Sequence, residues 1–355
     1  MLIKNSEPQK ERAVPLVAYL GPAFSFTHQA AIACFNQNHY NLVPASSISG
    51  KLLGSKLIQS LTKREVIDVF EVVYLEDVSL GVVPIENSTN GAVNITFDLM
   101  ADREEKFPDV KICDEAYLRV SHCLLGRKLA HQPTDSPLAS GMSTPTRSIP
   151  LPHLPRTTPI SSLKHIKRIF SHPQAWGQCE VFLAAFLKNI ERINVDSTSR
   201  AAELARADVT GTSAAISSGL VAEIQGLDIL AEGIEDRDDN TTRFVVLCKG
   251  VDMEAGSSIK TKSIISLIID DEVPGALAST LQCFAINSVN LTNIISLPTM
   301  EIPFQYIFFL EFEGSIHNDP DDRVRMALDN LKEFVQSWKW LGSWNDRIAM
   351  LQSQQ

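Results

Sequence analysis

The sequence predicts an α/β protein made of two units, a large N-terminal α/β domain and a smaller ferredoxin-like domain. At 355 residues the chain is longer than one average domain. Between residues 15 and 250, short apolar runs typical of buried strands alternate with segments of helical spacing, which favours mainly parallel strand pairing. After residue 262 the order becomes strand, helix, two strands, helix and strand, the β-α-β-β-α-β arrangement.

The N-terminal domain is expected to span residues 15–250. Its first strand is the apolar run 16–20, which ends at Gly21-Pro22, and helical spacing begins a few residues later. The same pattern recurs along the domain. It predicts strands at 16–20, 80–85, 118–125, 166–170, 213–217 and 244–247, and helices at 27–35, 93–100, 175–187, 199–207 and 220–225.

Two stretches interrupt this alternation and are expected to be surface insertions. Residues 127–160 hold seven of the 18 prolines together with many Ser and Thr, so they cannot sustain a helix or a central strand. Residues 49–64 form the second insertion and have some helical character.

The C-terminal domain is expected at residues 263–345, after a small, polar linker at 251–262. Pro274 opens the first helix at a position where its missing N–H costs nothing. The predicted elements are strands at 263–269, 291–297, 306–312 and 338–342, and helices at 274–286 and 320–336.

Composition excludes several functional classes. The chain has 32 basic and 42 acidic residues, and a net charge of −10 argues against binding to nucleic acid. No apolar run approaches the roughly 18 residues that cross a bilayer, so no membrane association is expected. The N-terminus lacks the apolar core of a secretory signal. Six scattered cysteines, without a C-x-x-C pair, favour reduced thiols in the cytoplasm.

Hydroxyl and amide side chains gather at four predicted strand-to-helix junctions, at residues 21–27, 84–91, 171–174 and 197–199. The carboxyl ends of parallel strands meet at one edge of a sheet, where open α/β folds bind ligands. Helix N-termini offer free N–H groups and partial positive charge, which suit a carboxylate. Each junction alone can be explained by helix N-caps. Together the four favour a site for a small organic acid.

Arg243 lies at the entrance to the apolar strand 244–247 and has two interpretations. Its guanidinium can clamp a carboxylate bidentately, or it can pair with the acidic run 235–239 on the surface. The sequence contains neither G-x-G-x-x-G after a strand nor a P-loop, and its eight histidines show no metal-binding spacing. We therefore expect a site without a cofactor or a metal.

The junction motifs closely resemble those of the prephenate dehydratase family with a C-terminal ACT regulatory domain. The resemblance covers nearly all of residues 15–345, and its motifs lie at 19–31, 83–93, 171–179, 197–202, 226–227, 240–244, 274–277 and 290–294. It implies a catalytic domain of two lobes similar to periplasmic binding proteins. It also implies conversion of prephenate to phenylpyruvate, with loss of water and CO2, in L-phenylalanine biosynthesis. ACT domains imply a homo-dimer or a higher homo-oligomer.

The family's Thr-Arg-Phe motif is present here as Thr242, Arg243 and Phe244. The resemblance implies that these residues are catalytic and that Thr242 is essential for turnover. It implies substrate contacts from the junction residues, which are Ser25, Thr27, Glu86, Asn87, Ser88, Thr89, His172, Gln174 and Thr198.

Prephenate carries two carboxylates and a ring hydroxyl, so an enzyme must hold a dianion and help the hydroxyl depart. We expect Thr242 to donate a hydrogen bond to the departing oxygen. Arg243 and the N–H groups near Ser88 and Ser25 are expected to hold the carboxylates. Glu86 is an acid if burial raises its pKa, or a brace for its loop. His172 donates a proton or caps its helix.

The sequence departs from the family pattern in two places. In the first motif, Phe24 stands where the family has a second glycine, and Ser25 replaces threonine. The family's effector motif Glu-Ser-Arg-Pro is Ile-Ser-Leu-Pro here, at residues 295–298, so both charges are lost. We expect L-phenylalanine to be a weakened or altered effector. The residues expected at its site are Gly275, Ala276, Leu277, Asn290, Leu291 and Ser296.

Two other functions remain open. Arogenate dehydratase carries out the same elimination on the amino-acid analogue, and the absence of an organellar transit sequence favours prephenate. A non-catalytic, amino-acid-sensing ACT protein is the second alternative. Retention of Thr242 and Arg243 beside an intact Asn87-Ser88 argues against a sensor.

Overall fold

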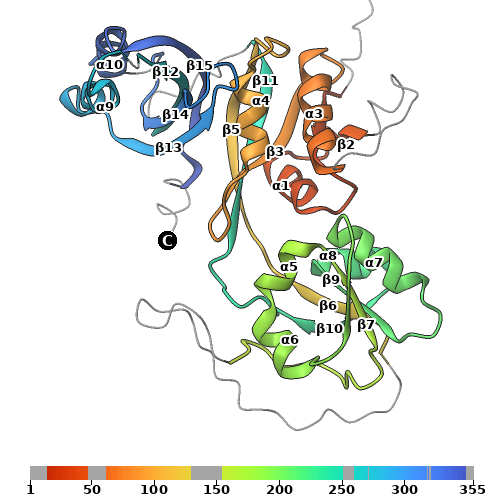
Figure 1. Cartoon of the computed structure of the whole chain (residues 1–355). Helices are drawn as coiled ribbons and strands as arrows, with labels where there is room; N and C mark the ends of the chain where they lie inside the picture. The colour runs from red at the N-terminus through yellow and green to blue at the C-terminus, as the bar shows by residue number, and fades with distance from the viewer. Residues whose placement is uncertain are drawn as a thin grey trace, which may run out of the picture.

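A computed structural model describes residues 14–46, 61–128, 154–250, 260–270, 272–317, 319 and 321–348. The chain forms two sheets, one of ten strands and one of five. Figure 1 shows three bodies, which we call lobe I (upper right), lobe II (green, below) and the C-terminal domain (blue, upper left). No helix in the described part of the chain is both long and apolar enough to cross a membrane.

Lobe I is built on the strand order β5-β11-β3-β1-β2. β1 is parallel to β2 and β3, whereas β11 is antiparallel to both of its neighbours. The strands are β1 (Leu16–Tyr19), β2 (Asn41–Pro44), β3 (Leu80–Asn87), β4 (Gly91–Ala92), β5 (Val110–Arg119) and β11 (Thr241–Lys249). The helices are α1 (Phe26–Cys34), α3 (Leu61–Tyr74) and α4 (Asn94–Ala101).

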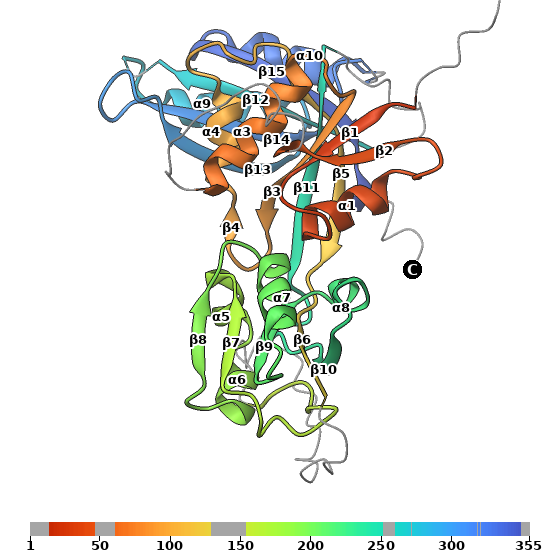
Figure 2. The ribbon, with the colours of Figure 1, turned by 90° about the vertical axis from the view of Figure 1, so that its right-hand side faces the viewer.

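Lobe II has the strand order β10-β6-β9-β7-β8, in which β7, β8 and β9 run parallel. Its strands are β6 (Cys123–Gly126), β7 (Arg168–Ser171), β8 (Glu191–Asn194), β9 (Ser213–Ser217) and β10 (Asp228–Glu232). Its helices are α5 (Pro173–Gln178), α6 (Glu180–Phe186), α7 (Thr198–Ala207) and α8 (Gly219–Gln225). Two segments, 120–122 and 233–240, connect the lobes (Figure 2).

The C-terminal domain has the predicted β-α-β-β-α-β order. Its strands are β12 (Thr261–Ile269), β13 (Leu291–Pro298), β14 (Tyr306–Glu313) and β15 (Val335–Asn345), and its helices are α9 (Ala276–Ile286) and α10 (Arg323–Leu331). β15 also pairs with β5 of lobe I at one position, Gly342 opposite Ile112, which joins the two units into one sheet. Gly342 has φ 134°, and a Cβ there would lie 2.0 Å from the Ile112 carbonyl oxygen. Only glycine allows this close approach.

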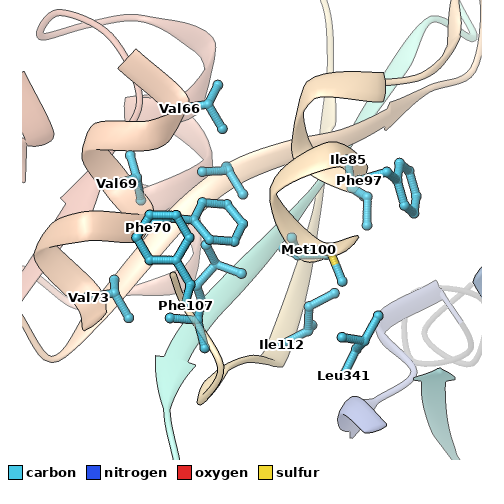
Figure 3. Close-up of a cluster of buried hydrophobic side chains, with 14 of the residues drawn as sticks. Val66, Val69, Phe70, Val73, Ile85, Phe97, Met100, Phe107, Ile112 and Leu341 are labelled. Atoms are coloured by element: carbon cyan, nitrogen blue, oxygen red, sulfur yellow. The ribbon is translucent and has the colours of Figure 1, made fainter. Parts of the chain in front are cut away.

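One hydrophobic core extends from lobe I into the C-terminal domain. Phe97 of α4 packs edge-on against Phe309 of β14, with ring centroids 5.1 Å apart. Figure 3 shows Leu341 of β15 beside Ile112 and Met100, with α3 contributing the far side of the cluster. Lobe I and the C-terminal domain therefore share buried apolar surface, whereas the sheet of lobe II has its own core.

The fold class is confirmed, but some predicted elements have different limits. The predicted strand 118–125 is the end of β5 followed by β6, in two different sheets. Apolar periodicity cannot show that a chain leaves one sheet for another. The predicted helix 175–187 is two helices, because residue Cys179 leaves helical geometry at φ −127°. α10 ends at Leu331, and β15 already begins at Val335.

Several elements of lobe I and lobe II were not predicted, namely most of β5, together with α3, β2, β8 and β10. β2 and β8 are edge strands whose residues are mostly exposed or half-buried, so they lack an apolar run. The predicted insertions and the linker fall mainly on residues 47–60, 129–153 and 251–259, which lie outside the described residues.

Candidate active site

Thr242 lies at the start of β11, where the chain enters lobe I from lobe II. It stands opposite Asn87, the last residue of β3, in the antiparallel register. The Asn87 amide Nδ2 donates to Thr242 Oγ1 at 2.9 Å and to Asn240 Oδ1 at 2.8 Å. The two residues that were expected in one site therefore have their side chains in contact.

The orientation of the Asn87 amide is fixed by its other end. Its Oδ1 accepts from the backbone N–H groups of Thr89 and Asn90, each at 3.0 Å. Two N–H donors can only face an oxygen, so Nδ2 must be the atom beside Thr242. Because the Thr242 hydroxyl accepts from Asn87, its own hydrogen remains available for a second partner.

Ser88 fastens the turn after β3 to the segment that comes from lobe II. Its N–H donates to the Thr241 carbonyl at 2.8 Å, and its hydroxyl donates to the Asp239 carbonyl at 3.1 Å. The same hydroxyl accepts from the Thr241 N–H at 2.9 Å. Since all of these groups are already engaged, the prediction that the Ser88 N–H holds substrate is corrected. Its position indicates a brace.

Ser25 is the N-cap of α1. Its hydroxyl donates to the Leu20 carbonyl at 3.1 Å and accepts from the His28 N–H at 3.2 Å. Thr27 is buried within the first turn of α1. For Ser25 the geometry therefore agrees with the capping alternative, whereas Thr27 is a buried residue of the helix.

Phe24 has a left-handed backbone, with φ 69°, a conformation that favours glycine. Its N–H donates to His28 Nδ1 at 2.9 Å, and its ring packs against the apolar side chains of lobe II. Gln29 Nε2, one turn into α1, donates to Ser218 Oγ of lobe II at 3.1 Å. In both views the start of α1 faces α7 and α8 (Figures 1 and 2). This junction therefore ties the two lobes together.

Three helices of lobe II begin just beyond the carboxyl ends of β7, β8 and β9. His172 caps α5 by accepting from the Gln174 N–H at 3.3 Å, and burial lowers the pKa of its imidazole. Gln174 is exposed, and Thr198 is the first residue of α7. Ser197 caps α7 by accepting from the Arg200 N–H at 3.1 Å. For His172 the cap is thus the alternative present in the structure.

Three buried serines lie at this edge of lobe II; Ser171 and Ser199 belong to the predicted junctions but were not assigned a substrate contact, and Ser217 lies outside those junctions. Ser171 ends β7, Ser217 ends β9, and Ser199 lies in the first turn of α7. Their hydroxyls have no hydrogen-bond partner among the described residues. A buried, unpaired polar group costs about 1–3 kcal/mol, so these hydroxyls are suited to a bound ligand. A sequence signal existed for Ser171 and Ser217, because each ends an apolar strand that is followed by a helix.

Arg243 does not reach substrate, and this prediction is corrected. Its side chain is 7 % exposed and lies between Glu115 of β5 and Glu311 of β14, with Nη2 at 2.7 Å from a carboxylate oxygen of each. Burial opposes its ionisation, but the two carboxylates outweigh this and raise its pKa above the usual value. Phe244 is 1 % exposed in the core of lobe I and likewise cannot contact substrate.

Glu86 also lies apart from Thr242. Asn293 of β13 donates to its carboxylate at 3.4 Å, and Arg243 Nη1 lies 3.9 Å away. A small pocket at this contact has room for about one water molecule. It is too small for prephenate, so Glu86 serves the boundary with the C-terminal domain. Among the residues that the structure describes, no group of His, Cys, Asp and Glu could hold a metal ion.

Comparison with known protein families shows which family the chain belongs to. The family model described as prephenate dehydratase matches residues 17–251. The chain belongs to the prephenate dehydratase family. It is 33% identical over 329 residues to a bifunctional chorismate mutase/prephenate dehydratase from Aquifex aeolicus, a match that covers 92% of this chain and 73% of the relative.

Other relatives place the chain within the dehydratases. It is 31% identical to arogenate dehydratase/prephenate dehydratase 2 from Arabidopsis thaliana, over 79% of this chain and 65% of that one. The structure of the Arthrobacter aurescens prephenate dehydratase in complex with L-Phe has a TM-score of 0.69 at 26% identity, covering 93% of this chain and 90% of that one. The Staphylococcus aureus prephenate dehydratase has a TM-score of 0.63 at 25% identity, covering 93% and 100%.

In this member of the prephenate dehydratase family, the two connecting segments are bonded to each other. The Glu235 carboxylate accepts from the His122 N–H at 2.8 Å and pairs with Arg156 at 3.1 Å. His122 Nε2 lies 2.7 Å from Gln178 Oε1 at the end of α5, and burial lowers the pKa of its imidazole. Asp236 accepts from two backbone N–H groups of α6, and burial raises its pKa to about 6.

The residues predicted for a prephenate dehydratase effector site lie on α9 and β13. Gly275 has φ 83° and precedes α9, where Ala276 is buried and Leu277 is exposed. Asn290 donates to Glu313 at 3.3 Å, and it is followed by Leu291 and the exposed Ser296 on the sheet edge.

The two apolar replacements in the effector motif have a structural role in this chain. Ile295 and Leu297 pack into the core shared with lobe I. Charged side chains at these positions would be buried against apolar groups such as Phe97, which is unfavourable. The departure from the family motif thus belongs to the contact between the C-terminal domain and lobe I.

Proposed function

We propose that the chain converts prephenate to phenylpyruvate between lobes I and II, with Thr242 as the catalytic hydrogen-bond donor. The hydrogen bond from Asn87 to Thr242 Oγ1 carries this proposal, because it commits the Thr242 hydrogen to a partner other than Asn87. That partner is the departing ring oxygen. The free energy of aromatisation drives the reaction once this oxygen leaves.

The reaction breaks two bonds of the substrate. The bond from the ring carbon to the carboxylate breaks and gives CO2, and its electron pair completes the aromatic ring. The bond from the opposite ring carbon to the hydroxyl breaks at the same time, and the leaving hydroxide takes up a proton from the solvent to become water. Thr242 is a weak acid, so it stabilises the charge that develops on the leaving oxygen rather than giving up its proton.

The substrate carboxylates need other partners, because Arg243 is occupied. The N-terminus of α7 carries partial positive charge, and the buried Ser199 hydroxyl in its first turn has no partner among the described residues. We propose that this end of lobe II binds one carboxylate, aided by Ser171 and Ser217. A substrate bound there would contact both lobes, with its carboxylate at α7 of lobe II and its ring hydroxyl at Thr242 of lobe I.

Two variants test this function by the appearance of phenylpyruvate. Thr242→Val keeps the shape of the side chain but removes the hydroxyl, and kcat should fall by about 10²–10³. Ser199→Ala should mainly raise KM. Thr241→Val, one residue along the same strand, should stay within about threefold of the wild-type kcat. A near-wild-type kcat for Thr242→Val would refute the proposed role.

Arogenate is the second candidate substrate, since relatives at 30–32% identity are named arogenate dehydratases or arogenate dehydratase/prephenate dehydratases. The two substrates share the reacting ring and differ in the side chain, where an ammonium group replaces the keto oxygen. The ratio of the two kcat/KM values decides between them. A ratio that favours arogenate by more than tenfold would replace prephenate as the substrate.

We further propose that the C-terminal domain is an ACT domain that binds L-phenylalanine weakly and pairs subunits into a homo-oligomer in the cytoplasm. The neutral residues Ile295 and Leu297 support weak binding. Exposed apolar residues on the β13–β14 connection, Met300, Ile302 and Phe304, support association. All six cysteines are free thiols, in keeping with a reducing compartment. Light scattering tests whether the chain forms a homo-oligomer. Titration of L-phenylalanine into the activity assay tests whether the effector binds weakly.

A further inference from the structure

We infer that the C-terminal domain holds Thr242 in its working position through Arg243, so that Glu311 is a positioning residue for the reaction. The inference rests on the proposed function, because it takes Thr242 to act on substrate. It gives the C-terminal domain a direct part in turnover, and it defines a route by which a ligand on that domain changes kcat.

Arg243 belongs to a buried cluster of charges that both units build. Its Nε donates to Glu115 of lobe I at 2.9 Å, and its Nη2 lies 2.7 Å from Glu311 of the C-terminal domain. Lys262 of β12 lies 3.8 Å from Glu115, 4.0 Å from Glu311 and 3.4 Å from Asp346. All five side chains are at least nine-tenths buried. Water cannot screen these charges, so each depends on its neighbours.

The position of Arg243 along β11 links this cluster to the catalytic hydroxyl. Arg243 follows Thr242 directly on β11. In the antiparallel pairing with β3, Thr242 stands opposite Asn87 and Arg243 stands opposite Glu86. The Arg243 guanidinium also lies 5.8 Å from the ring centres of Tyr117 and Trp344, one in each unit. Fixing this side chain from both units fixes the backbone that carries Thr242. A displacement of about 1 Å in a catalytic group can cost about 100-fold in rate.

A second set of contacts connects β13 to the same place. Thr292 donates to the Glu311 carboxylate at 2.7 Å, and Asn293 donates to Glu86 at 3.4 Å. β13 also carries Leu291 and Ser296, two of the residues predicted for the effector site. A shift of β13 therefore reaches both Arg243 and the residue beside Asn87. A ligand on this strand is expected to change kcat rather than the affinity for substrate.

The test compares two glutamates of the C-terminal domain. Glu311→Gln keeps the shape of the side chain and removes its charge, and kcat should fall by about 10- to 100-fold while KM stays within about threefold. Glu333→Gln removes the same charge from an exposed position on this domain and should match wild type. Thr292→Val removes only the hydrogen bond to Glu311, with less risk to folding, and should lower kcat by about threefold.

Hydrogen exchange provides a readout that does not depend on turnover. In Glu311→Gln, amides at residues 240–244 should exchange faster, whereas those of α9 and α10 should not change. Wild-type kcat in folded Glu311→Gln and Thr292→Val would overturn the inference, as would faster exchange spread evenly over the C-terminal domain. Failure of the proposed function is seen separately, as wild-type kcat in Thr242→Val.

Discussion

Asn87→Asp should reverse the hydrogen bond on which the proposed role of Thr242 depends. The substituted side chain has the same shape, and one carboxylate oxygen can still accept from the N–H groups of Thr89 and Asn90, so the turn is kept. The other oxygen takes the place of Nδ2, 2.9 Å from Thr242 Oγ1. A carboxylate only accepts, so the Thr242 hydroxyl must donate to it. Its hydrogen is then lost to the leaving oxygen.

Two effects set the size of the loss. Removing one donor to the developing charge costs about 10²–10³ in kcat. The new carboxylate also repels the substrate dianion. With an effective dielectric constant of about 20 and a separation of about 6 Å, each charge pair costs about 3 kcal/mol, or about 100-fold in binding. We therefore expect kcat/KM to fall by at least about 10⁴.

The assay is the formation of phenylpyruvate by Asn87→Asp and by Asn90→Asp, which adds the same charge on an exposed side chain of the same turn. The second variant should stay within about threefold of wild type. Lowering the pH toward 5 should restore part of the activity of Asn87→Asp, because a protonated carboxyl can donate to Thr242 as the amide does. If Asn87→Asp kept more than a tenth of the wild-type kcat, the reasoning would be refuted.

Substitutions at three further positions probe other parts of the structure. Gly342→Ala places a Cβ 2.0 Å from the Ile112 oxygen, so we expect a loss of about 3 kcal/mol in unfolding free energy, measured in urea. Phe24→Ala keeps the left-handed backbone but removes the ring that contacts lobe II, so the KM of this variant should rise. Phe24→Gly also removes the ring and should have the same KM as Phe24→Ala. Its melting temperature should be higher than that of Phe24→Ala, because glycine relieves the strain at φ 69°. The raised pKa of Asp236, about 6, means that the folded state binds more protons than the unfolded state between about pH 4 and 6. Stability should therefore fall as the pH rises through this range, and Asp236→Asn should flatten that part of the profile.

Each of these expectations has a contradicting result. Wild-type stability of Gly342→Ala would show that β15 and β5 do not approach so closely. Equal melting temperatures for the two Phe24 variants would show that the backbone at this position carries no strain. An unchanged pH profile in Asp236→Asn would mean that this carboxyl is solvated in the folded protein.

The sequence predicted the partners at the proposed site better than it predicted their roles. The family resemblance put Thr242 and Asn87 in one site, and their side chains are hydrogen-bonded to each other. Whether Ser25 and His172 cap helices or bind substrate was left open, since both roles favour the same residue types at the same position. Only the hydrogen bonds within the folded chain distinguish the two.

Arg243 shows what local patterns cannot reveal. Both interpretations of its sequence context, a substrate clamp and a surface pair with residues 235–239, were wrong. Its partner Glu115 lies 128 residues away along the chain, and its other partner, Glu311, belongs to a different unit. Such a pairing depends on how the two units join, which no periodicity encodes. Ile295 and Leu297 carried a weak sign of this contact, because apolar residues replace charged ones there.

The single pairing between β15 and β5 sets how the three parts of the molecule are connected. It makes lobe I and the C-terminal domain one continuous unit, whereas lobe II is joined to lobe I by the segments 120–122 and 233–240 and by the contacts of Phe24 and Gln29 at the start of α1. Lobe II is therefore the part of the molecule with the fewest connections to the rest of the described chain. Within the shared sheet, β11 is the strand that carries Thr242, so it lies between the C-terminal domain and the proposed site.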